Sequence, residues 1–335
     1  MERLQALHRW VSRFYTVPFE ALTPASADAS FRRYFRLHTS GGSVILMDAP
    51  PEKEDCHSFV RVAEIFSRAG LNVPKVLQWD SQEGFMILTD FGPISYLQAL
   101  QAPGVTSQRV SELYADALAA LVRLQQASHP EILPAYDQHL LRRELELFPQ
   151  WYVQGHLGLD WGGESREVFD KVTTTLLRAI EQQGRVFVHR DYHSRNLMLC
   201  EPNPGVLDFQ DAVYGPVTYD VVSLLKDAYI AWDEEQLLDW LVRYWERARG
   251  AGVPVDPDFG AFYQDFEWMG VQRHLKVLGI FARLCQRDGK TGYLADMPRV
   301  AQYLTRTCRR YKELQLLGML LEKMWEIETV SGLTF

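Results

Sequence analysis

The sequence has few cysteines and no long apolar run. Its four cysteines, Cys56, Cys200, Cys285 and Cys308, are far apart, and no two of them form a C-x-x-C pair. This spacing argues against a disulfide framework or a cysteine-based zinc site and predicts reduced thiols. No stretch of 18 apolar residues is present, and the first 20 residues form an amphipathic, charged segment. We therefore expect neither a membrane span nor a signal peptide, and a cytoplasmic protein.

A surplus of basic residues is also missing. The 335 residues include 35 lysines and arginines against 43 aspartates and glutamates, which gives a net charge of −8. This balance implies no basic face of the kind that holds a nucleic-acid backbone, so we expect no nucleic acid and no membrane as partner, and no protein partner is implied. The remaining composition, 47% hydrophobic and 23% charged, is that of a globular protein with room for two domains.

The pattern of predicted secondary structure changes near residue 90. The first part mixes one predicted helix over 58–68 with predicted strands over 30–37, 43–47, 76–79 and 85–88. The second part has one strand region over 186–209 and predicted helices over 107–126, 164–183, 219–231, 234–249, 259–286 and 297–326. We therefore predict an α+β fold with a small β-rich N-lobe, residues 1–90, and a larger helical C-lobe, residues 91–335.

Three polar side chains in the segment 186–211 adjoin short apolar stretches that would otherwise be pure core. They are Asp191, Asn196 and Asp208. Phosphoryl transfer needs one carboxylate that orients the attacking hydroxyl and accepts its proton, and it needs a carboxylate and an amide oxygen that hold magnesium. The pattern therefore predicts a catalytic base at Asp191 and magnesium ligands at Asn196 and Asp208.

Two other interpretations of local motifs fail on their context. His189 and His193, at i and i+4, would bind zinc only on a helix, whereas the Val-Phe-Val before them predicts a strand. The Gly-Lys-Thr at 289–291 lacks the preceding strand of a P-loop, and Leu284 stands where its first glycine is needed.

The same segment resembles a known catalytic loop. Residues 189–196 match the kinase pattern H-R-D-x-x-x-x-N, and Asp208-Phe-Gln resembles the magnesium-binding D-F-G. Protein kinases usually carry Lys where His193 stands, and here the chain runs directly from Asp208 into a Gly-Pro and a Tyr-Asp-Val. That ending resembles the aminoglycoside and choline phosphotransferase branch, in which a helix-starting aspartate, here Asp220, braces the catalytic loop.

Further segments resemble one subgroup of that branch, the bacterial N-acetylmuramate/N-acetylglucosamine 1-kinases of cell-wall recycling. The segments are 28–36, 47–55, 189–198, 208–212, 273–284 and 287–290. The resemblance implies a bilobal protein-kinase-like fold and transfer of a phosphoryl group from ATP, with Mg²⁺, to the anomeric hydroxyl of these amino sugars. The alternatives are an aminoglycoside or other small-molecule hydroxyl phosphotransferase, and a pseudokinase that only binds partners.

The resemblance also implies individual roles in catalysis. Asp191 would orient and deprotonate the sugar hydroxyl, and His189 would brace the loop with Asp220 as structural support. Asn196 and Asp208 would bind magnesium.

For the nucleotide, the resemblance implies two segments. The expected cofactor-binding residues are Asp28, Ala29, Ser30 and Arg32 in the phosphate-covering loop, and Leu88, Thr89, Asp90 and Phe91 at the hinge between lobes. Two departures matter. The phosphate-covering segment 26–30 contains no glycine, so backbone approach to a phosphate is less free than in a glycine-rich loop. More seriously, Met47 stands where kinases place the lysine that pairs with the phosphates. Lys53, Arg32 and Arg33 are the nearest cations that could replace it.

The sugar site is expected in the helical lobe, where aromatic faces and polar groups occur together. The candidate substrate-binding residues are His193, Arg195, Glu144, Phe148, Trp151 and His274. His193 and Arg195 share the loop of Asp191, and Arg195 could pair with a lactyl carboxylate or hold the loop by a salt bridge.

Overall fold

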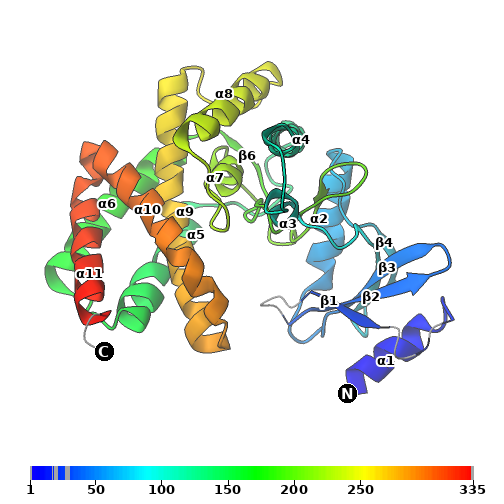
Figure 1. Cartoon of the computed structure of the whole chain (residues 1–335). Helices are drawn as coiled ribbons and strands as arrows, with labels where there is room; N and C mark the ends of the chain where they lie inside the picture. Colours follow the sequence, from blue (N-terminus) through cyan, green and yellow to red (C-terminus); the bar gives the residue numbers. More distant parts are fainter. Residues whose placement is uncertain (1, 17, 19–21, 27–30, 333–335) are drawn as a thin grey trace. The chain divides into compact units, whose positions relative to one another are not determined.

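The computed structural model describes residues 2–16, 18, 22–26 and 31–332, and the chain divides into two compact units (Figure 1). Unit 1 contains residues 1–120 and 195–211, and unit 2 contains residues 121–194 and 212–335. The α+β fold class is confirmed, with a β-sheet N-terminal part and a mainly helical remainder. The assignment of nucleotide binding to residues 1–90, and of catalysis and sugar binding to residues 91–335, stays a prediction.

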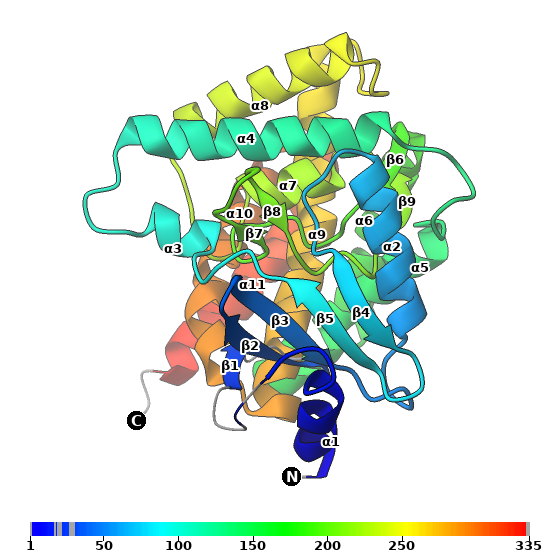
Figure 2. The same cartoon turned by 90° about the vertical axis from the view of Figure 1, so that its right-hand side faces the viewer.

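Unit 1 is built around one antiparallel sheet in the order β1-β2-β3-β5-β4, and Figure 2 shows these strands side by side. Helix α4 (Ser107–Gln126) begins in this unit and ends in unit 2. The elements of unit 1 are α1 (Glu2–Val11), β1 (Thr23–Ser26), β2 (Arg33–Thr39), β3 (Gly42–Asp48), α2 (Cys56–Arg68), β4 (Val76–Asp80), β5 (Phe85–Thr89), α3 (Tyr96–Leu100), β7 (Leu197–Met198) and β8 (Gly205–Val206). The β7–β8 hairpin joins this unit because Met198 bridges Ser95 and Gly205 bridges Asn72.

Helix α1 covers one face of this sheet. Its buried side chains pack against alternate residues of β2, β3 and β5, as the two-residue period of a strand requires. This core contains Leu7, Trp10, Val11, Phe35, Leu37, Val44, Leu46, Phe85 and Ile87. Met47 is on the opposite face, and it is fully buried beside its cross-strand neighbours Tyr34 and Met86.

A carboxylate with no solvent exposure ties α1 to the sheet. Asp48 accepts hydrogen bonds from Arg3 Nε at 2.9 Å and from Arg33 Nε at 3.0 Å. We expect Asp48→Asn to lower the free energy of unfolding by about 1–3 kcal/mol, because buried charge-assisted hydrogen bonds are lost. The partly exposed arginines regain water, so the loss stays below that of breaking a fully buried pair.

Urea unfolding measures this loss, with Glu64→Gln as the matched control. Glu64 is an exposed carboxylate on α2 that pairs with exposed Arg68 at 3.6 Å, so its substitution should change stability by less than about 0.5 kcal/mol. Equal effects of the two substitutions would contradict the structural role of Asp48.

Unit 2 is mainly helical. Its elements are α5 (Gln138–Leu145), the π-helix η2 (Phe148–His156), α6 (Gly163–Gln182), β6 (Arg185–Val188), β9 (Val213–Pro216), α7 (Tyr219–Leu225), α8 (Glu234–Gly250), α9 (Phe259–Asp288), the 3₁₀ helix η3 (Thr291–Asp296), α10 (Met297–Arg310), the 3₁₀ helix η4 (Lys312–Leu314) and α11 (Gln315–Gly332). Strands β6 and β9 form an antiparallel pair.

Helix α9 forms the centre of unit 2, with α5, α6, α7, α10 and η2 in contact with it (Figure 1). Asp258 caps its first turn by accepting a hydrogen bond from the Ala261 amide at 2.8 Å. Gly289, at φ +68°, ends it in the left-handed conformation that glycine adopts at little cost. Gly279 lets the main chain of Leu147 approach closely, because a Cβ there would lie 2.4 Å from its carbonyl carbon.

Two predicted helices end earlier than expected. The prediction of one helix over 297–326 is wrong, because Tyr311 is extended (φ −113°, ψ 125°) and separates α10 from α11. The helix predicted over 219–231 ends at Leu225, since the backbone leaves the helical region at Lys226. Leu314 is buried at the first break, so tertiary packing overrides a continuous helical pattern there.

The structure also bears on the expected lack of a membrane span and on the expected state of the cysteines. No helix among them is long and apolar enough to cross a membrane. All four cysteines are described, and all four are free thiols.

Candidate active site

The catalytic-loop residues of unit 2 follow strand β6 directly. Asp220, at the start of α7, accepts the His189 amide at 2.6 Å and the Arg190 amide at 3.0 Å. Its side chain is 1% exposed, and burial raises its pKa to about 7 in spite of these two donors. These two hydrogen bonds tie the catalytic loop to the start of α7, which is the kind of contact that the family resemblance implies for Asp220.

Arg190 adopts an unusual backbone conformation, with φ +78°. A non-glycine residue in this region costs about 1–3 kcal/mol and persists only where neighbours fix it. Here the Arg190 guanidinium pairs with Glu144 and lies over the Tyr136 ring, 5.6 Å from its centre. This turn sets the direction in which the next residue, Asp191, leaves the loop.

Asp191 is the one acidic residue of the loop 189–196, and 44% of its side chain is exposed. Its amide donates to His189 Nδ1 at 3.2 Å, which gives His189 a bracing contact inside the loop. Partial burial alone would raise the pKa of Asp191, but the positive charges of Lys276 and Arg273 outweigh it and hold the pKa below its usual range. The carboxylate is therefore ionised at neutral pH.

The predicted magnesium ligands lie together in unit 1. Asn196 Nδ2 is 3.4 Å from Asp208 Oδ2, and the Asn196 carbonyl accepts the Leu207 amide at 2.9 Å. The short β7–β8 hairpin makes these two residues neighbours although twelve positions separate them in the sequence. Gln210 Nε2 donates to the other oxygen of Asp208 at 2.8 Å.

The side chain of Asp208 is exposed, and its backbone is held in place from the core side. Asp208 has φ +64°, a second non-glycine residue in the left-handed region. The next residue, Phe209, is fully buried and packs against Phe59 and Phe66 of α2, at ring-centre distances of 4.9 and 5.9 Å. The buried ring of Phe209 anchors this segment to the core, while the carboxylate of Asp208 stays exposed to solvent.

The chemistry of this donor pair fits a hard divalent cation. Carboxylate and amide oxygens are ligands of Mg²⁺, which keeps several waters and is usually bound through one or two protein groups plus substrate phosphates. No group of three or more His, Cys, Asp or Glu side chains able to hold a metal occurs among the described residues. A tight all-protein cage of the zinc type is thus missing from that part of the chain, and the binding of magnesium by Asn196 and Asp208 stays a prediction.

The predicted hinge residues lie at the end of β5 and beyond it. Leu88 is 2% exposed, and the Thr89 hydroxyl accepts the Lys75 amide at 3.0 Å. The Asp90 carboxylate accepts bonds from Arg36 Nε at 2.6 Å, from Ser43 at 2.7 Å and from a main-chain amide. Burial opposes ionisation of Asp90, yet these bonds lower its pKa. The Asp90 carboxylate is thus engaged within the protein, and contact of Asp90 and Phe91 with a nucleotide stays a prediction.

The phosphate-loop residues Asp28, Ala29 and Ser30 lie outside the described residues. Arg32 forms an ion pair with Glu54 at 2.9 Å. The other two cations considered as replacements for the strand lysine also have partners, since Arg33 pairs with Asp48 and Lys53 lies 4.6 Å above the ring of Phe31. What pairs with the phosphates therefore stays a prediction.

The predicted sugar-binding residues are only partly brought together. Glu144 is buried beside Arg190, whereas Arg195 is exposed and belongs to unit 1. The ring of His193 packs edge-on against Tyr229, at 5.3 Å.

The other three candidates lie on η2 and α9. Phe148 is fully buried and stacks on Tyr152, and Trp151 is partly exposed. His274 is 2% exposed, stacks on Tyr303 at 4.9 Å and hydrogen-bonds the Lys226 carbonyl through Nε2 at 3.1 Å. Phe148 and His274 thus occupy core positions, and sugar contact by any of the three stays a prediction.

The buried position of His274 predicts a pH effect on stability. Burial, followed by the nearby charge of Lys226, lowers the pKa of His274 from 6.5 to about 3. The unfolded chain takes up a proton here below about pH 6.5, whereas the folded state does so only near pH 3. The contribution of His274 is therefore complete above pH 6.5 and is lost as the pH falls towards 3.

Denaturation of the wild type and of His274→Gln between pH 4 and 8 measures this effect. The wild type should lose stability more steeply than the variant as the pH falls below about 6.5. Taking the difference of the two profiles removes the contribution of Asp220, whose raised pKa acts in the opposite direction. Parallel profiles would contradict a neutral, buried His274.

In this part of α9, sequence reasoning named only His274 as a substrate-binding candidate and gave no individual role to Arg273 or Lys276. Both side chains are 5% exposed and face the loop from α9. Two charged residues three positions apart within a long apolar helix are a signal that could have identified them, because charge at core positions requires partners.

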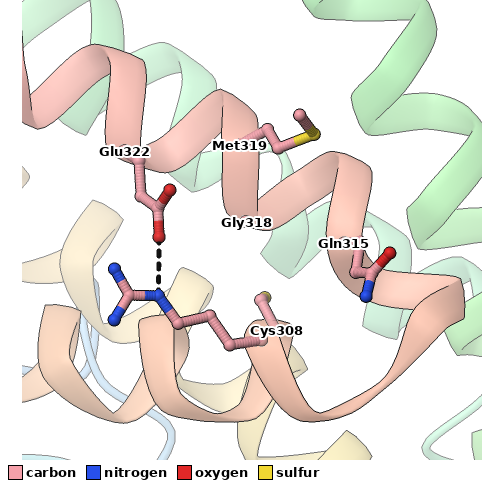
Figure 3. Close-up of a pocket in the computed structure, with 6 residues that line it drawn as sticks. Cys308, Gln315, Gly318, Met319 and Glu322 are labelled. Carbon is pink, nitrogen blue, oxygen red and sulfur yellow. Dashed lines mark hydrogen bonds and ion pairs between the residues drawn. The ribbon is translucent and has the colours of Figure 1, made fainter.

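A cavity of about 280 Å³ lies away from these residues, between α10 and α11 (Figure 3). Its lining residues are Cys308, Arg309, Gln315, Gly318, Met319 and Glu322. Arg309 Nε and Glu322 Oε1 pair across it at 2.8 Å. None of the residues predicted for catalysis or binding lines it.

Comparison with known proteins gives a consistent result at the level of sequence. A family described as "Phosphotransferase enzyme family" matches residues 21–253. An N-acetylmuramate/N-acetylglucosamine kinase from Pseudomonas aeruginosa is 51% identical over 308 residues, which cover 92% of this chain and 90% of the relative. One of the same name from Neisseria meningitidis serogroup B is 48% identical over 338 residues and covers 100% of both chains.

Solved structures share the fold at low sequence identity. Choline kinase from Streptococcus pneumoniae has a TM-score of 0.62 at 10% identity, covering 90% of this chain and 99% of that one. An amicoumacin kinase in complex with AMP-PNP, Ca²⁺ and Ami has a TM-score of 0.62 at 17% identity, with coverage of 88% and 91%. The aminoglycoside phosphotransferase APH(2'')-Ib, ADP-bound, has a TM-score of 0.58 at 13% identity and covers 89% and 97%. The predicted protein-kinase-like fold is confirmed.

Proposed function

The chain belongs to the phosphotransferase enzyme family, and from this premise we propose that it is an ATP-dependent sugar 1-kinase. Its acceptors would be N-acetylmuramate and N-acetylglucosamine, phosphorylated at the anomeric hydroxyl in the recycling of peptidoglycan. The names of the relatives at 51% and 48% identity support the choice of sugar. The observation that carries the catalytic assignment is the ionised, accessible carboxylate of Asp191 on a braced loop.

The reaction forms a bond from the sugar O1 to the γ-phosphorus and breaks the bond from that phosphorus to the leaving oxygen of ADP. The hydroxyl proton passes to Asp191. Because the pKa of Asp191 is held low, the carboxylate is a weak base that orients the hydroxyl in the ground state. The proton then moves late, when the O1–phosphorus bond is forming, which suits the loose transition state of phosphoryl transfer.

Asn196 and Asp208 would hold magnesium in this proposal. The bound ion would neutralise charge on the phosphate oxygens. The exposed carboxylate of Asp208 is anchored by buried Phe209, so it meets the nucleotide without a change in the hydrophobic core. The segment from Leu88 to Phe91 would meet the adenine through main-chain groups.

ATP turnover with N-acetylmuramate, N-acetylglucosamine and kanamycin in parallel tests the proposal. We expect turnover with both sugars in the presence of magnesium and none with kanamycin. Turnover with kanamycin alone would favour an antibiotic kinase. The absence of turnover with both sugars, at catalytic amounts of enzyme, would reject the proposed function.

A further inference from the structure

A buried polar cluster in unit 2 surrounds the base of the catalytic loop. Three helices, the segment before α5 and the loop itself contribute to it. We call it the sub-loop cluster, and its members are Gln272, Arg273 and Lys276 of α9, Glu144 of α5, Tyr219 of α7, Tyr136 and the loop residue Arg190. Every member except Arg190 is at most 5% exposed. So much buried charge is costly unless its geometry is useful or fully paired.

Arg273 contacts the loop in two places. Its Nη1 donates to the Arg190 carbonyl at 2.6 Å and to the Tyr219 hydroxyl at 3.2 Å. Its Nη2 lies 3.7 Å from Asp191 Oδ1. One planar guanidinium therefore holds the main chain of the left-handed residue and faces the carboxylate that follows it.

Lys276 supports the same turn through Glu144 and Tyr219. Its Nζ lies 2.9 Å from Glu144 Oε1 and 3.0 Å from the Tyr219 hydroxyl. Glu144 in turn pairs with the Arg190 guanidinium and accepts from Tyr136 and Gln272. The side chain of Arg190 is thereby fixed by Glu144, while its carbonyl is fixed by Arg273.

The charges facing Asp191 are mostly positive. They come from Lys276 and Arg273 on α9 and from His193 and Arg190 in the loop, with His189 Nδ1 at its amide. The carboxylate of Asp220 on α7 faces it with the opposite sign. Arg273 and Lys276 therefore stabilise the negative charge on Asp191 by proximity rather than by a close hydrogen bond.

We propose that Arg273 is the positioning residue of the catalytic loop: it fixes the turn at Arg190 and holds the Asp191 carboxylate aimed at the acceptor hydroxyl. Lys276 is the second cation of this device and acts on the loop through Glu144. The inference rests on the proposed function, because it assigns Asp191 to the acceptor. It adds a role that neither the loop motif nor the metal ligands provide.

The experiment compares Arg273→Met with the wild type in steady-state kinetics and in a pH titration of Asp191. We expect kcat to fall by about 10²-fold, since small misplacement of a reacting group costs this much. KM for ATP should stay within about threefold, and the acid limb of kcat should move to higher pH, as loss of an opposite charge predicts. In protein with ¹³C-labelled aspartate carboxylates, the Asp191 signal, assigned with Asp191→Asn, should titrate at higher pH in the variant.

Two further variants make the result decisive. Arg273→Lys keeps the positive charge but loses the planar guanidinium that contacts both Arg190 and Asp191. We therefore expect kcat to fall while the acid limb of kcat stays in place. If Arg273→Met does not fold, the kcat of Arg273→Lys tests the positioning role instead. Arg310→Met is the matched control, because Arg310 pairs with buried Glu267 at 2.8 Å and with Glu234, neither of which belongs to the catalytic loop. It should lower stability and leave kcat and its pH profile unchanged.

The inference is overturned if folded Arg273→Met keeps the wild-type kcat, acid limb and Asp191 titration, or if Arg273→Lys, used in its place, keeps the wild-type kcat. Failure of the proposed function is a separate result. It appears as a wild-type protein that turns over neither sugar, and the carboxylate titration then still decides whether Arg273 controls Asp191.

Discussion

Replacing Asp191 by Asn should lower kcat by roughly 10²- to 10⁴-fold, the range that a general base contributes. The substitution keeps the size of the side chain and removes the negative charge that Arg273 and Lys276 face. ATP affinity should stay within a few fold, since Asp191 acts on the acceptor in our account. Steady-state kinetics give the first quantity, and a fluorescence titration with a nucleotide analogue gives the second.

Asp239→Asn is the control for this change. Asp239 is an exposed aspartate of α8 paired with Arg243, so its loss should leave kcat unchanged. Substantial activity in folded Asp191→Asn would mean that the base has been misassigned. Loss of nucleotide binding in that variant would instead place Asp191 at the phosphates.

The second large effect is expected at Asp208. Asp208→Asn should reduce kcat by at least about 10²-fold at fixed magnesium and raise the magnesium concentration needed for half-maximal rate, because a charged oxygen ligand is lost. Part of the rate should return at high magnesium. A magnesium titration of the initial rate, run beside the wild type, measures both changes.

Glu201→Gln tests whether the effect belongs to this site. Glu201 is an exposed acid in the same β7–β8 hairpin, so its loss removes a negative charge from the same segment. It should leave the magnesium dependence as in the wild type. An unchanged magnesium requirement in Asp208→Asn would contradict the assignment of Asp208 as a ligand.

Much of the secondary structure could be predicted from the sequence, because it follows from local periodicity. The helix predicted over 107–126 has the bounds of α4, and the helix predicted over 259–286 differs from α9 by two residues at one end. The break at Tyr311 could not be predicted in the same way. No proline or glycine marks it, and the residue that favours it, Leu314, is buried only in the tertiary fold.

The candidate site also combines residues that a local pattern predicts with residues that it does not. The spacing of Asp191, Asn196 and Asp208 is a local pattern, and the structure brings the last two together through one short hairpin. The buried charges that act on Asp191 come from α9, more than 80 positions further along the chain. Contacts at such separation produce no local periodicity. Charge at core positions of α9 marks Arg273 and Lys276 as residues that need partners, but it does not indicate that the partner is the loop of Asp191.

Burial is the other quantity that the sequence patterns did not provide. Phe148 and His274 were candidates for the sugar because aromatic and polar groups often line such sites. The structure places both in the core, where an aromatic stripe serves packing. Glu144 is buried as well, but among charged partners, because its carboxylate pairs with Arg190 and Lys276.

The central claim is that this protein phosphorylates the anomeric hydroxyl of an N-acetylated amino sugar. The most direct measurement is ³¹P NMR of the product formed from ATP and N-acetylglucosamine, with the methyl glycoside of the same sugar, whose anomeric oxygen is blocked, as a parallel acceptor. Our account predicts a sugar 1-phosphate from the free sugar and no product from the glycoside. Phosphorylation of the glycoside, or a phosphate at another hydroxyl of the free sugar, would contradict it.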